Sequence, residues 1–164
     1  MIDVTLGVII LRILVISDVH GDRANLNKVL LTQSKAEVVI FLGDGADDVE
    51  QAKINFPEKM FIMVRGNCDW GCKLPIEEVR TIEGKKIKAT HGHMYNVKST
   101  YSDIIYSAFG DNCDIVLFGH THTAFTDYND GLYIMNPGSL HGYGGTYGII
   151  DITPNGVVTN ILKI

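Results

Sequence analysis

Histidines stand next to glycine at several places in this sequence. Five of the six histidines have a glycine as an immediate neighbour. A histidine on a backbone bend can present its ring as a metal ligand or as an acid–base group. A surface turn would explain one such pair, but five pairs indicate a functional site. The pairs are His20-Gly21, His91-Gly92-His93, Gly119-His120 and His141-Gly142.

Polar side chains also follow each apolar segment that reads as a buried strand. In chain order they are Asp18-Val19-His20, Gly43-Asp44, Gly66-Asn67-Cys68-Asp69, His91-Gly92-His93 and Gly119-His120-Thr121-His122. Side chains two residues apart at a strand end point the same way, so Asp18 and His20 can bind one cation. Ligands of open α/β sheets bind at the carboxyl ends of the strands. Any one of these segments alone could be a turn, but the ordered set predicts a metal site at this edge.

The side chains gathered at this edge define the expected metal. The candidate ligands are Asp18, His20, Asp44, Asn67, His91, His120 and His122. This oxygen and nitrogen set suits Mn²⁺, Fe²⁺, Ni²⁺, Co²⁺ or Zn²⁺, and it is richer in histidine than a Mg²⁺ or Ca²⁺ site. Seven ligands are too many for one tetrahedral ion and enough for two ions bridged by Asp44. Two ions about 3.5–4 Å apart can hold both oxygens of a displacement at phosphorus. We therefore expect two divalent transition-metal ions and favour Mn²⁺.

Hydrophobic patterns predict the elements that position these groups. Apolar runs without alternation predict strands buried on both faces at 11–17, 38–42, 61–64 and 115–118. Helical spacing predicts three helices: one that starts after Asp22 and includes Gln33, one ending at Pro57, and one with Tyr101 to Phe109 on one face. For the third helix, Thr100 and Asp103 resemble a capping box and Gly110 suits the position after the helix.

The remaining strands alternate more and indicate antiparallel pairing. We expect a hairpin of 78–82 and 85–90 around Glu83-Gly84, and short strands at 124–128, 132–135, 147–151 and 157–162. Turns at 129–131 and 154–156 join the last four strands in pairs. A parallel α/β first half with a β-rich second half fits two packed sheets with helices outside.

Composition limits the class of protein. The chain has 164 residues and is 46% hydrophobic, which excludes a disordered chain. A net charge of −5 argues against a nucleic-acid-coating surface, and three cysteines argue against a disulfide framework and favour the cytoplasm. The apolar run 4–16 is shorter than the ~20 residues of a membrane span, so we expect no membrane association. We interpret 1–164 as one domain, with residues 1–10 as an N-terminal extension.

Over residues 11–140 the ordered motifs resemble the calcineurin-like metallophosphoesterase superfamily. The short chain and Asn136-Pro137-Gly138-Ser139 resemble its small prokaryotic phosphodiesterase subfamily. The resemblance implies an α/β/β/α sandwich of two mixed β-sheets flanked by helices, with the metal site at the carboxyl ends of the strands. It also implies that Asp18, His20, Asp44 and His122 bind one ion, and that Asp44, Asn67, His91 and His120 bind the other.

The implied activity is hydrolysis of a phosphodiester by metal-activated water at a dinuclear centre. In this superfamily the third motif usually carries a histidine that is the proposed proton donor to the leaving group, and Cys68 replaces it here. A neutral thiol, with a pKa of ~8.5, is a poor substitute. Asp69 is retained, and His93 or water would supply the proton, so we expect Asp69 and His93 to be catalytic. We expect turnover of activated or aryl diesters and weak turnover of phosphomonoesters.

The alternative function is a metal-binding scaffold or regulatory module of the same fold without significant turnover, as for the retromer subunit in this superfamily. A complete set of seven ligands favours the enzyme. The expected partners are a small phosphodiester and, optionally, further copies of this chain. We expect Trp70 to anchor its loop or to pack on a base or aryl group, and His141 to lie in a surface turn. We expect Cys68 and Cys72 to be reduced thiols.

Overall fold

The central strand of the first sheet comes from the apolar run that opens the described part of the chain. The computed structural model describes residues 11–164, and the predicted extension 1–10 lies outside the described residues. Strands β1 (Leu11–Ile16), β2 (Val38–Phe41) and β3 (Met60–Met63) run parallel, and β9 (Thr146–Thr153) and β10 (Gly156–Lys163) add antiparallel strands in the order β10-β9-β1-β2-β3. This mixed sheet matches the parallel first half expected from the sequence.

The second sheet is also mixed and has five strands. It contains β4 (Glu77–Ile82), β5 (Lys85–Thr90), β6 (Ile115–Leu117), β7 (Phe125–Asn129) and β8 (Leu132–Asn136), in the order β4-β5-β6-β8-β7. Strands β5, β6 and β8 are parallel, and the two edge strands are antiparallel to their neighbours. The hairpins predicted at 78–90 and 124–135 are therefore confirmed.

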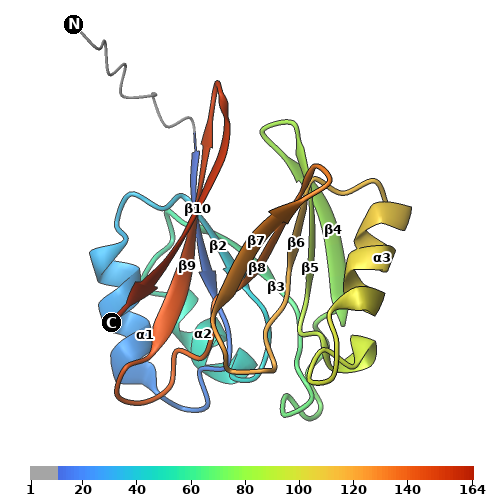
Figure 1. Ribbon diagram of the computed structural model, residues 1–164. Coiled ribbons are helices and arrows are strands. Elements are labelled where there is room, and N and C mark those ends of the chain that lie inside the picture. Colours follow the sequence, from blue (N-terminus) through green and yellow to red (C-terminus); the bar gives the residue numbers. More distant parts are fainter. Residues whose placement is uncertain (1–10) are drawn as a thin grey trace, which may run out of the picture.

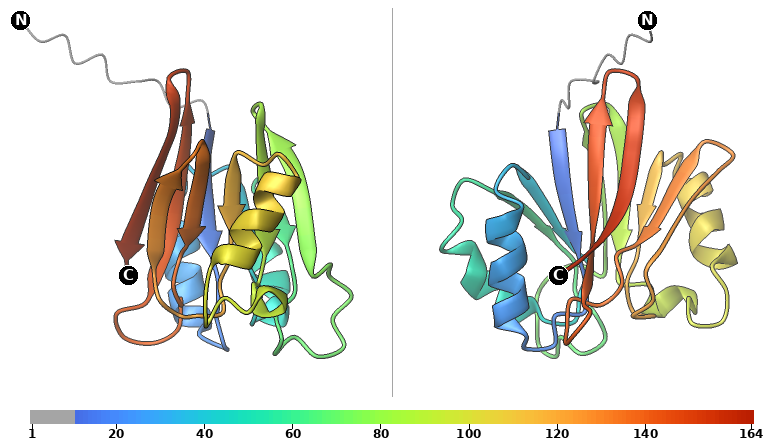
Figure 2. Two further views of the ribbon diagram at one scale, coloured as in Figure 1. Left: turned by 45° about the vertical axis from the view of Figure 1, so that its right-hand side comes forward. Right: turned by 60° about the vertical axis from the view of Figure 1, so that its left-hand side comes forward.

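Three hydrophobic clusters divide the molecule into four layers. Helices α1 (Arg23–Thr32) and α2 (Ala46–Lys53) cover the outer face of the first sheet, and α3 (Ser102–Gly110) covers the second (Figures 1 and 2). Along β1, Ile13 and Val15 face the other sheet, whereas Leu14 and Ile16 pack against the helices. Both faces of the strand are buried, which explains its unbroken apolar sequence. The predicted α/β/β/α sandwich is confirmed.

Three predicted helix ends are wrong. Helix α2 ends at Lys53, four residues before Pro57, because Asn55 and Phe56 already make turn hydrogen bonds. Helix α3 begins after Tyr101 without a side-chain cap, so the expected capping box does not form. Gly110 belongs to the helix, and Asn112 takes the left-handed conformation beyond it, with φ of 55°. Asparagine tolerates that conformation, because its short polar side chain makes local hydrogen bonds.

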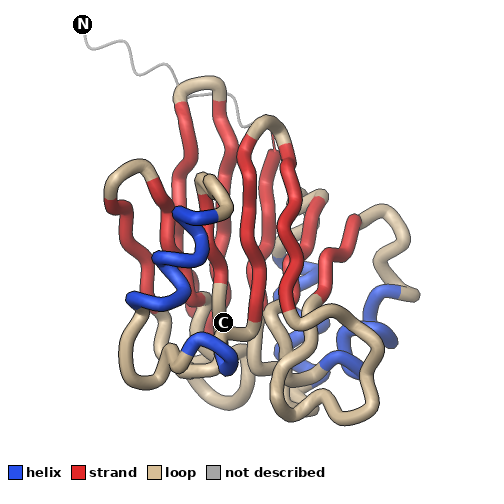
Figure 3. The backbone as a smooth tube through the Cα atoms, turned by 90° about the vertical axis from the view of Figure 1, so that its right-hand side faces the viewer, coloured by secondary structure: helices blue, strands red, loops and turns tan. Residues whose placement is uncertain are grey.

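The long loops gather at one end of the sandwich, and short hairpins close the other end (Figure 3). The loop end is where β1, β2, β3, β5 and β6 finish (Figure 1), so all the predicted motifs lie there. None of the helices in residues 11–164 combines the length and the apolar character that crossing a bilayer requires.

A buried ion-pair network fastens α3 to the second sheet. The side chain of Lys88 in β5 is only 1% exposed. Its Nζ contacts Asp111 Oδ2 at 2.6 Å, Ser107 Oγ at 2.7 Å and Glu77 Oε1 at 2.9 Å. Burial lowers the pKa of Lys88, but the hydrogen bonds to Asp111 and Glu77 raise it more, so the ammonium stays charged.

We predict that Lys88→Ala lowers the free energy of unfolding by about 3 kcal/mol, because removing one partner of a buried ion pair leaves the others uncompensated. Removing one partner of a buried ion pair usually costs about 3–5 kcal/mol of stability. Glu77 and Asp111 are partly exposed and can be hydrated in the variant, so we expect a loss at the low end of that range. Denaturant unfolding at pH 7 measures it, with the exposed Lys28→Ala as a control that should change stability little. A loss below about 1 kcal/mol, typical of surface pairs, would contradict a structural role for the network.

Candidate metal centre

The predicted metal ligands come from both sheets and meet where the two sheets' loops face each other. Asp18 and His20 follow β1, Asp44 follows β2 and Asn67 follows β3 in the first sheet. His91 follows β5, and His120 and His122 follow β6 in the second sheet. The structure brings all seven side chains to this end of the sandwich.

The first group of side chains contains Asp18, His20 and His122. Nε2 of His122 lies 3.1 Å from Asp18 Oδ1, and Nε2 of His20 lies 3.6 Å from the same oxygen. The two Nε2 atoms are 3.3 Å apart. Three ligand atoms that converge on one point from three sides can bind a single cation.

The second group contains Asn67, His91 and His120 around the carboxylate of Asp44. Nε2 of His91 lies 3.1 Å from Asn67 Oδ1, 3.1 Å from His120 Nδ1 and 3.4 Å from Asp44 Oδ2. His91 is fully buried, and its Nδ1 donates a hydrogen bond of 2.7 Å to the carbonyl of Leu42. That bond fixes the tautomer and leaves the Nε2 lone pair directed at the group.

Asp44 joins the two groups. Its Oδ2 lies 3.4 Å from Nε2 of His91 and 3.8 Å from Nε2 of His20. Its Oδ1 accepts a hydrogen bond of 2.8 Å from the amide of Cys68, which holds the carboxylate in this orientation. One oxygen of Asp44 is therefore within reach of both groups, as a bridging ligand must be.

One buried carboxylate oxygen, Asp18 Oδ1, has no hydrogen-bond donor within the described part of the chain and indicates whether these residues suit metal ions. Asp18 Oδ2 accepts hydrogen bonds from Ser17 Oγ at 2.7 Å and from the amide of His120 at 3.1 Å. Asp18 Oδ1 is buried and accepts no hydrogen bond from the residues described. A buried carboxylate oxygen without a donor is costly unless a cation compensates it. The donor set and this oxygen fit divalent metal ions.

The protonation states of the buried groups also suit metal binding. Burial raises the pKa of Asp44, but His91 and the amide of Cys68 lower it more, so the carboxylate stays ionised. Burial and the neighbouring His91 lower the pKa of His120 to about 4, which leaves that ring neutral with a free lone pair. Burial lowers the pKa of His91, but Asp44 raises it more, so a metal ion at Nε2 competes with a proton for the same lone pair.

Five of the predicted ligands have a left-handed backbone conformation. Asp18, His20, Asp44, His120 and His122 have φ between 45° and 68°. Non-glycine residues adopt this region rarely, at a cost of about 1–3 kcal/mol, and such residues concentrate at functional sites. All five residues lie in the loops just after their strands, where their ligand atoms come close together.

Asp69 clamps the loops that carry Asp44 and Asn67. Its Oδ2 accepts hydrogen bonds from the amides of Asp44 at 2.8 Å and Gly66 at 2.7 Å. Its Oδ1 accepts from the amides of Gly45 at 2.8 Å and Ala46 at 2.9 Å, at the start of α2. Because both oxygens are engaged with backbone, Asp69 positions Asp44. Its predicted catalytic role remains a prediction.

The other predicted catalytic residue, His93, lies beside the second group. Its ring centre is 5.5 Å from that of His91 and 6.2 Å from that of His120. Its Nδ1 is buried without a hydrogen-bond partner among residues 11–164. Burial and the nearby His91 lower the pKa of His93, so the ring is neutral near pH 7.

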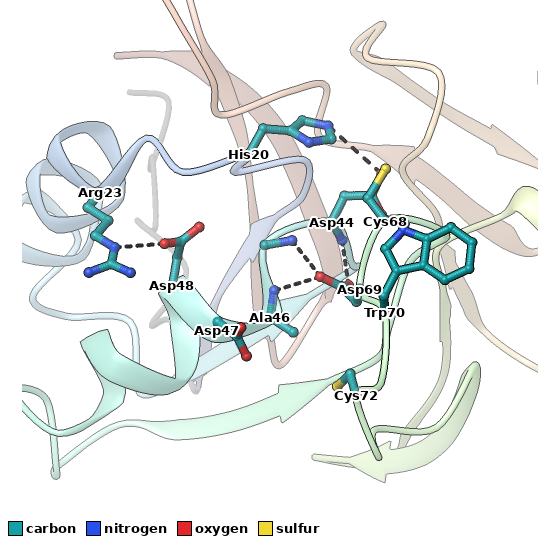
Figure 4. Close-up of a pocket in the computed structure, with 11 residues that line it drawn as sticks. His20, Arg23, Asp44, Ala46, Asp47, Asp48, Cys68, Asp69, Trp70 and Cys72 are labelled. Carbon is teal, nitrogen blue, oxygen red and sulfur yellow. Dashed lines mark hydrogen bonds and ion pairs between the residues drawn. The ribbon is translucent and has the colours of Figure 1, made fainter.

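Sequence reasoning missed two neighbours of the centre, His141 and Ser17, and it had already named Cys68. The ring of His141 lies 6.3 Å from that of His20, and the only sequence signal for it was its adjacent glycine. Ser17 orients Asp18, and nothing in its position revealed this. The sulfur of Cys68 lies within 4.8 Å of the ligand atoms of His20 and Asp44, close to Trp70 (Figure 4).

Comparisons with known proteins agree with this geometry. The calcineurin-like phosphoesterase superfamily domain matches residues 11–155. A probable metallophosphoesterase, YsnB of Bacillus subtilis, is 31% identical over 79% of this chain and 75% of its own length. The phosphodiesterase YfcE of Escherichia coli K12 is 26% identical over 86% of this chain and 88% of its own.

A solved structure of similar fold is vacuolar protein sorting 29 from Cryptosporidium parvum. It has a TM-score of 0.73 at 18% identity and covers 94% of this chain and 97% of its own. The family match spans all the loops that carry the predicted ligands, and the first relative is 31% identical over 130 aligned residues. This chain belongs to the calcineurin-like phosphoesterase superfamily.

Proposed function

We propose that the protein is a metal-dependent phosphodiesterase with a dinuclear centre. The observation that carries this proposal is the position of Asp44 Oδ2 between the His20 and His91 rings, within 3.8 Å of both. Two divalent ions bound there, Mn²⁺ being favoured, would lower the pKa of a water and stabilise the charge that develops on the phosphoryl oxygens. Phosphoester hydrolysis is also the activity named for the family and for both curated relatives.

The protein's own residues have separate tasks in this proposal. Asp18, His20 and His122 would hold one ion, Asn67, His91 and His120 would hold the other, and Asp44 would contribute to both. Asp69 keeps Asp44 in place through its amide hydrogen bonds. His93 lies on the second group's side and can exchange a proton with a departing oxygen through its nitrogen atoms.

Cys68 favours diesters with good leaving groups. Burial raises the pKa of the Cys68 thiol, and the Asp44 carboxylate raises it further, so the thiol stays neutral and a weak acid. An aryl or otherwise activated alcohol leaves without a strong proton donor, whereas a poor leaving group needs one. We propose a small phosphodiester as the substrate and the cytoplasm as the compartment.

The second candidate function is a scaffold of the same fold without turnover. The similarity to vacuolar protein sorting 29 is the observation that favours it. A scaffold that binds no metal has no physical need to keep five ligands in left-handed conformations, which cost folding free energy. This cost supports a metal centre, and turnover separates the enzyme from a metal-binding scaffold.

We predict that chelator-treated protein releases no p-nitrophenol from bis(p-nitrophenyl) phosphate and that added Mn²⁺ restores the activity. Asp44→Asn should lower kcat/KM at least about 100-fold, since losing a ligand costs more than losing its supporting hydrogen bond. Exposed Asp127→Asn is the matched control and should retain activity. Absence of turnover with any of Mn²⁺, Ni²⁺, Co²⁺ and Zn²⁺ would overturn the enzyme proposal.

Replacing the thiol tests the proton-donor argument. Cys68→His should increase hydrolysis of p-nitrophenyl phosphate and of diesters with poor leaving groups, because an imidazole can protonate the departing oxygen. Steady-state rates on both substrate types, with Cys68→Ser as a control of similar size, measure the gain. If Cys68→His leaves both activities unchanged, the missing donor does not limit the reaction.

Asp69→Asn tests the clamp. Burial raises the pKa of Asp69, but its four amide hydrogen bonds lower it more. Its contribution to stability is therefore complete above the unfolded pKa of about 3.9 and is lost as the pH falls through the lower, folded value. The variant should be less stable than the wild type at pH 7, and the difference should shrink as the pH falls below about 4.

The same substitution should lower kcat/KM and Mn²⁺ affinity about 10–100-fold, the range for a group that supports a metal ligand. Chemical unfolding and Mn²⁺ titration on one preparation give both quantities. A stability difference that does not vary with pH would contradict an ionised clamp.

A further inference from the structure

A cavity of about 400 Å³ opens directly beside two of the proposed metal ligands. His20 and Asp44 form one wall, and the loop from Cys68 to Cys72 forms another (Figure 4). A phosphodiester has two organic groups, and a phosphoryl group at the centre would place one of them at this opening. The chemistry of the cavity walls therefore bears on which group is accepted.

Trp70 supplies a large aromatic surface at the edge of this cavity. Its side chain is 91% exposed, although full burial of a residue of this size is strongly favourable. In Figure 4 the indole ring stands beside Cys68, at the opposite side of the cavity from Arg23. The amide of Trp70 donates a hydrogen bond of 3.1 Å to the carbonyl of Cys68. This bond forms a tight turn that holds the Trp70 backbone beside Cys68. The ring does not anchor the loop, as one sequence prediction had it, because it is not packed into the protein.

The charged groups of the cavity are mostly used within the protein. Arg23 Nε contacts Asp48 Oδ1 at 2.7 Å, and Asp48 Oδ2 accepts from the amide of Gly21 at 3.0 Å. Both oxygens of Asp69 are bound to backbone amides. Asp47 is exposed and has no ion pair among the described residues. The cavity therefore offers a second phosphate no free cation from residues 11–164, and a carboxylate repels it.

We propose that this cavity binds a planar aromatic ring of the substrate, a nucleobase or an aryl group without negative charge, stacked on Trp70. The inference rests on the proposed function, because the phosphoryl group at the metal centre brings the ring to the cavity. Stacking of a base on an aromatic side chain tolerates different bases, since each has a π-face. The expected substrate is thus a nucleotide-like or aryl phosphodiester with a single phosphate.

Trp70 is the only tryptophan of the chain, so its fluorescence reports on the cavity directly. We would titrate Zn²⁺-loaded protein with thymidine 5′-monophosphate, methyl phosphate and phosphocholine, which carry the same phosphate on different groups. Thymidine 5′-monophosphate should quench the emission with saturation, whereas methyl phosphate should bind without quenching and compete with it. Stronger binding of phosphocholine than of the thymidine ligand would overturn the aromatic ring as the occupant, because a cation would then be preferred.

Substitutions separate stacking from a merely structural role. Trp70→Ala should raise the inhibition constant of thymidine 5′-monophosphate at least about 10-fold and leave that of methyl phosphate unchanged. Trp70→Phe keeps an aromatic ring, so its inhibition constant for thymidine 5′-monophosphate should stay within about threefold of the wild-type value. Tyr106→Ala is the matched control, because Tyr106 is 83% exposed on α3 and does not line the cavity.

Two results would overturn the inference without touching the proposed function: no quenching in protein that hydrolyses bis(p-nitrophenyl) phosphate, or equal weakening of both inhibitors in Trp70→Ala. Quenching by thymidine 5′-monophosphate in protein that hydrolyses no diester would do the reverse. It would confirm the ring-binding cavity and overturn the phosphodiesterase.

Discussion

The four hydrogen bonds that Asp69 accepts from backbone amides underlie the rest of the metal centre. They tie the loop after β2, the loop after β3 and the start of α2 into one unit. Asp44 sits inside this unit, and its carboxylate is the point where the His20 and His91 groups meet. Because one half-buried carboxylate holds three segments, a change at Asp69 reaches both groups of ligands at once. The substrate cavity shares the same loop, since Trp70 follows Asp69 directly.

The close approach of the loops requires glycine at two places. A Cβ at Gly66 would overlap the carboxylate of Asp44, and a Cβ at Gly119 would overlap the side chain of Ser17. Strain at five left-handed ligands is sustained because the two sheets beneath them are fully packed. A rigid support that holds ligands close to their bound geometry lowers the free energy needed to organise them when ions bind. The scaffold thus explains both the strain and its location.

Local sequence patterns predicted most of the fold correctly. The apolar runs became β1, β2, β3 and β6, because a strand covered on both faces needs no polar side. The errors lie at helix ends, where packing and turn hydrogen bonds override residue preference. Gly110 was expected to end α3, but the chain continues to Asp111 and turns at Asn112, which places Cys113 against the core. Such choices depend on contacts distant in sequence, which periodicity does not record.

The sequence by itself determined the identity of the candidate ligands, because each polar motif follows an apolar run and only side-chain chemistry is needed to recognise it. The tertiary structure determined their grouping. Three ligand loops come from one sheet and two from the other, and face-to-face packing of the sheets brings His20 to His122 and Asn67 to His91. Spacing along the chain cannot reveal this, because it depends on strand order across space. For the same reason the fold brings His141 beside His20 and leaves Trp70 exposed at the cavity.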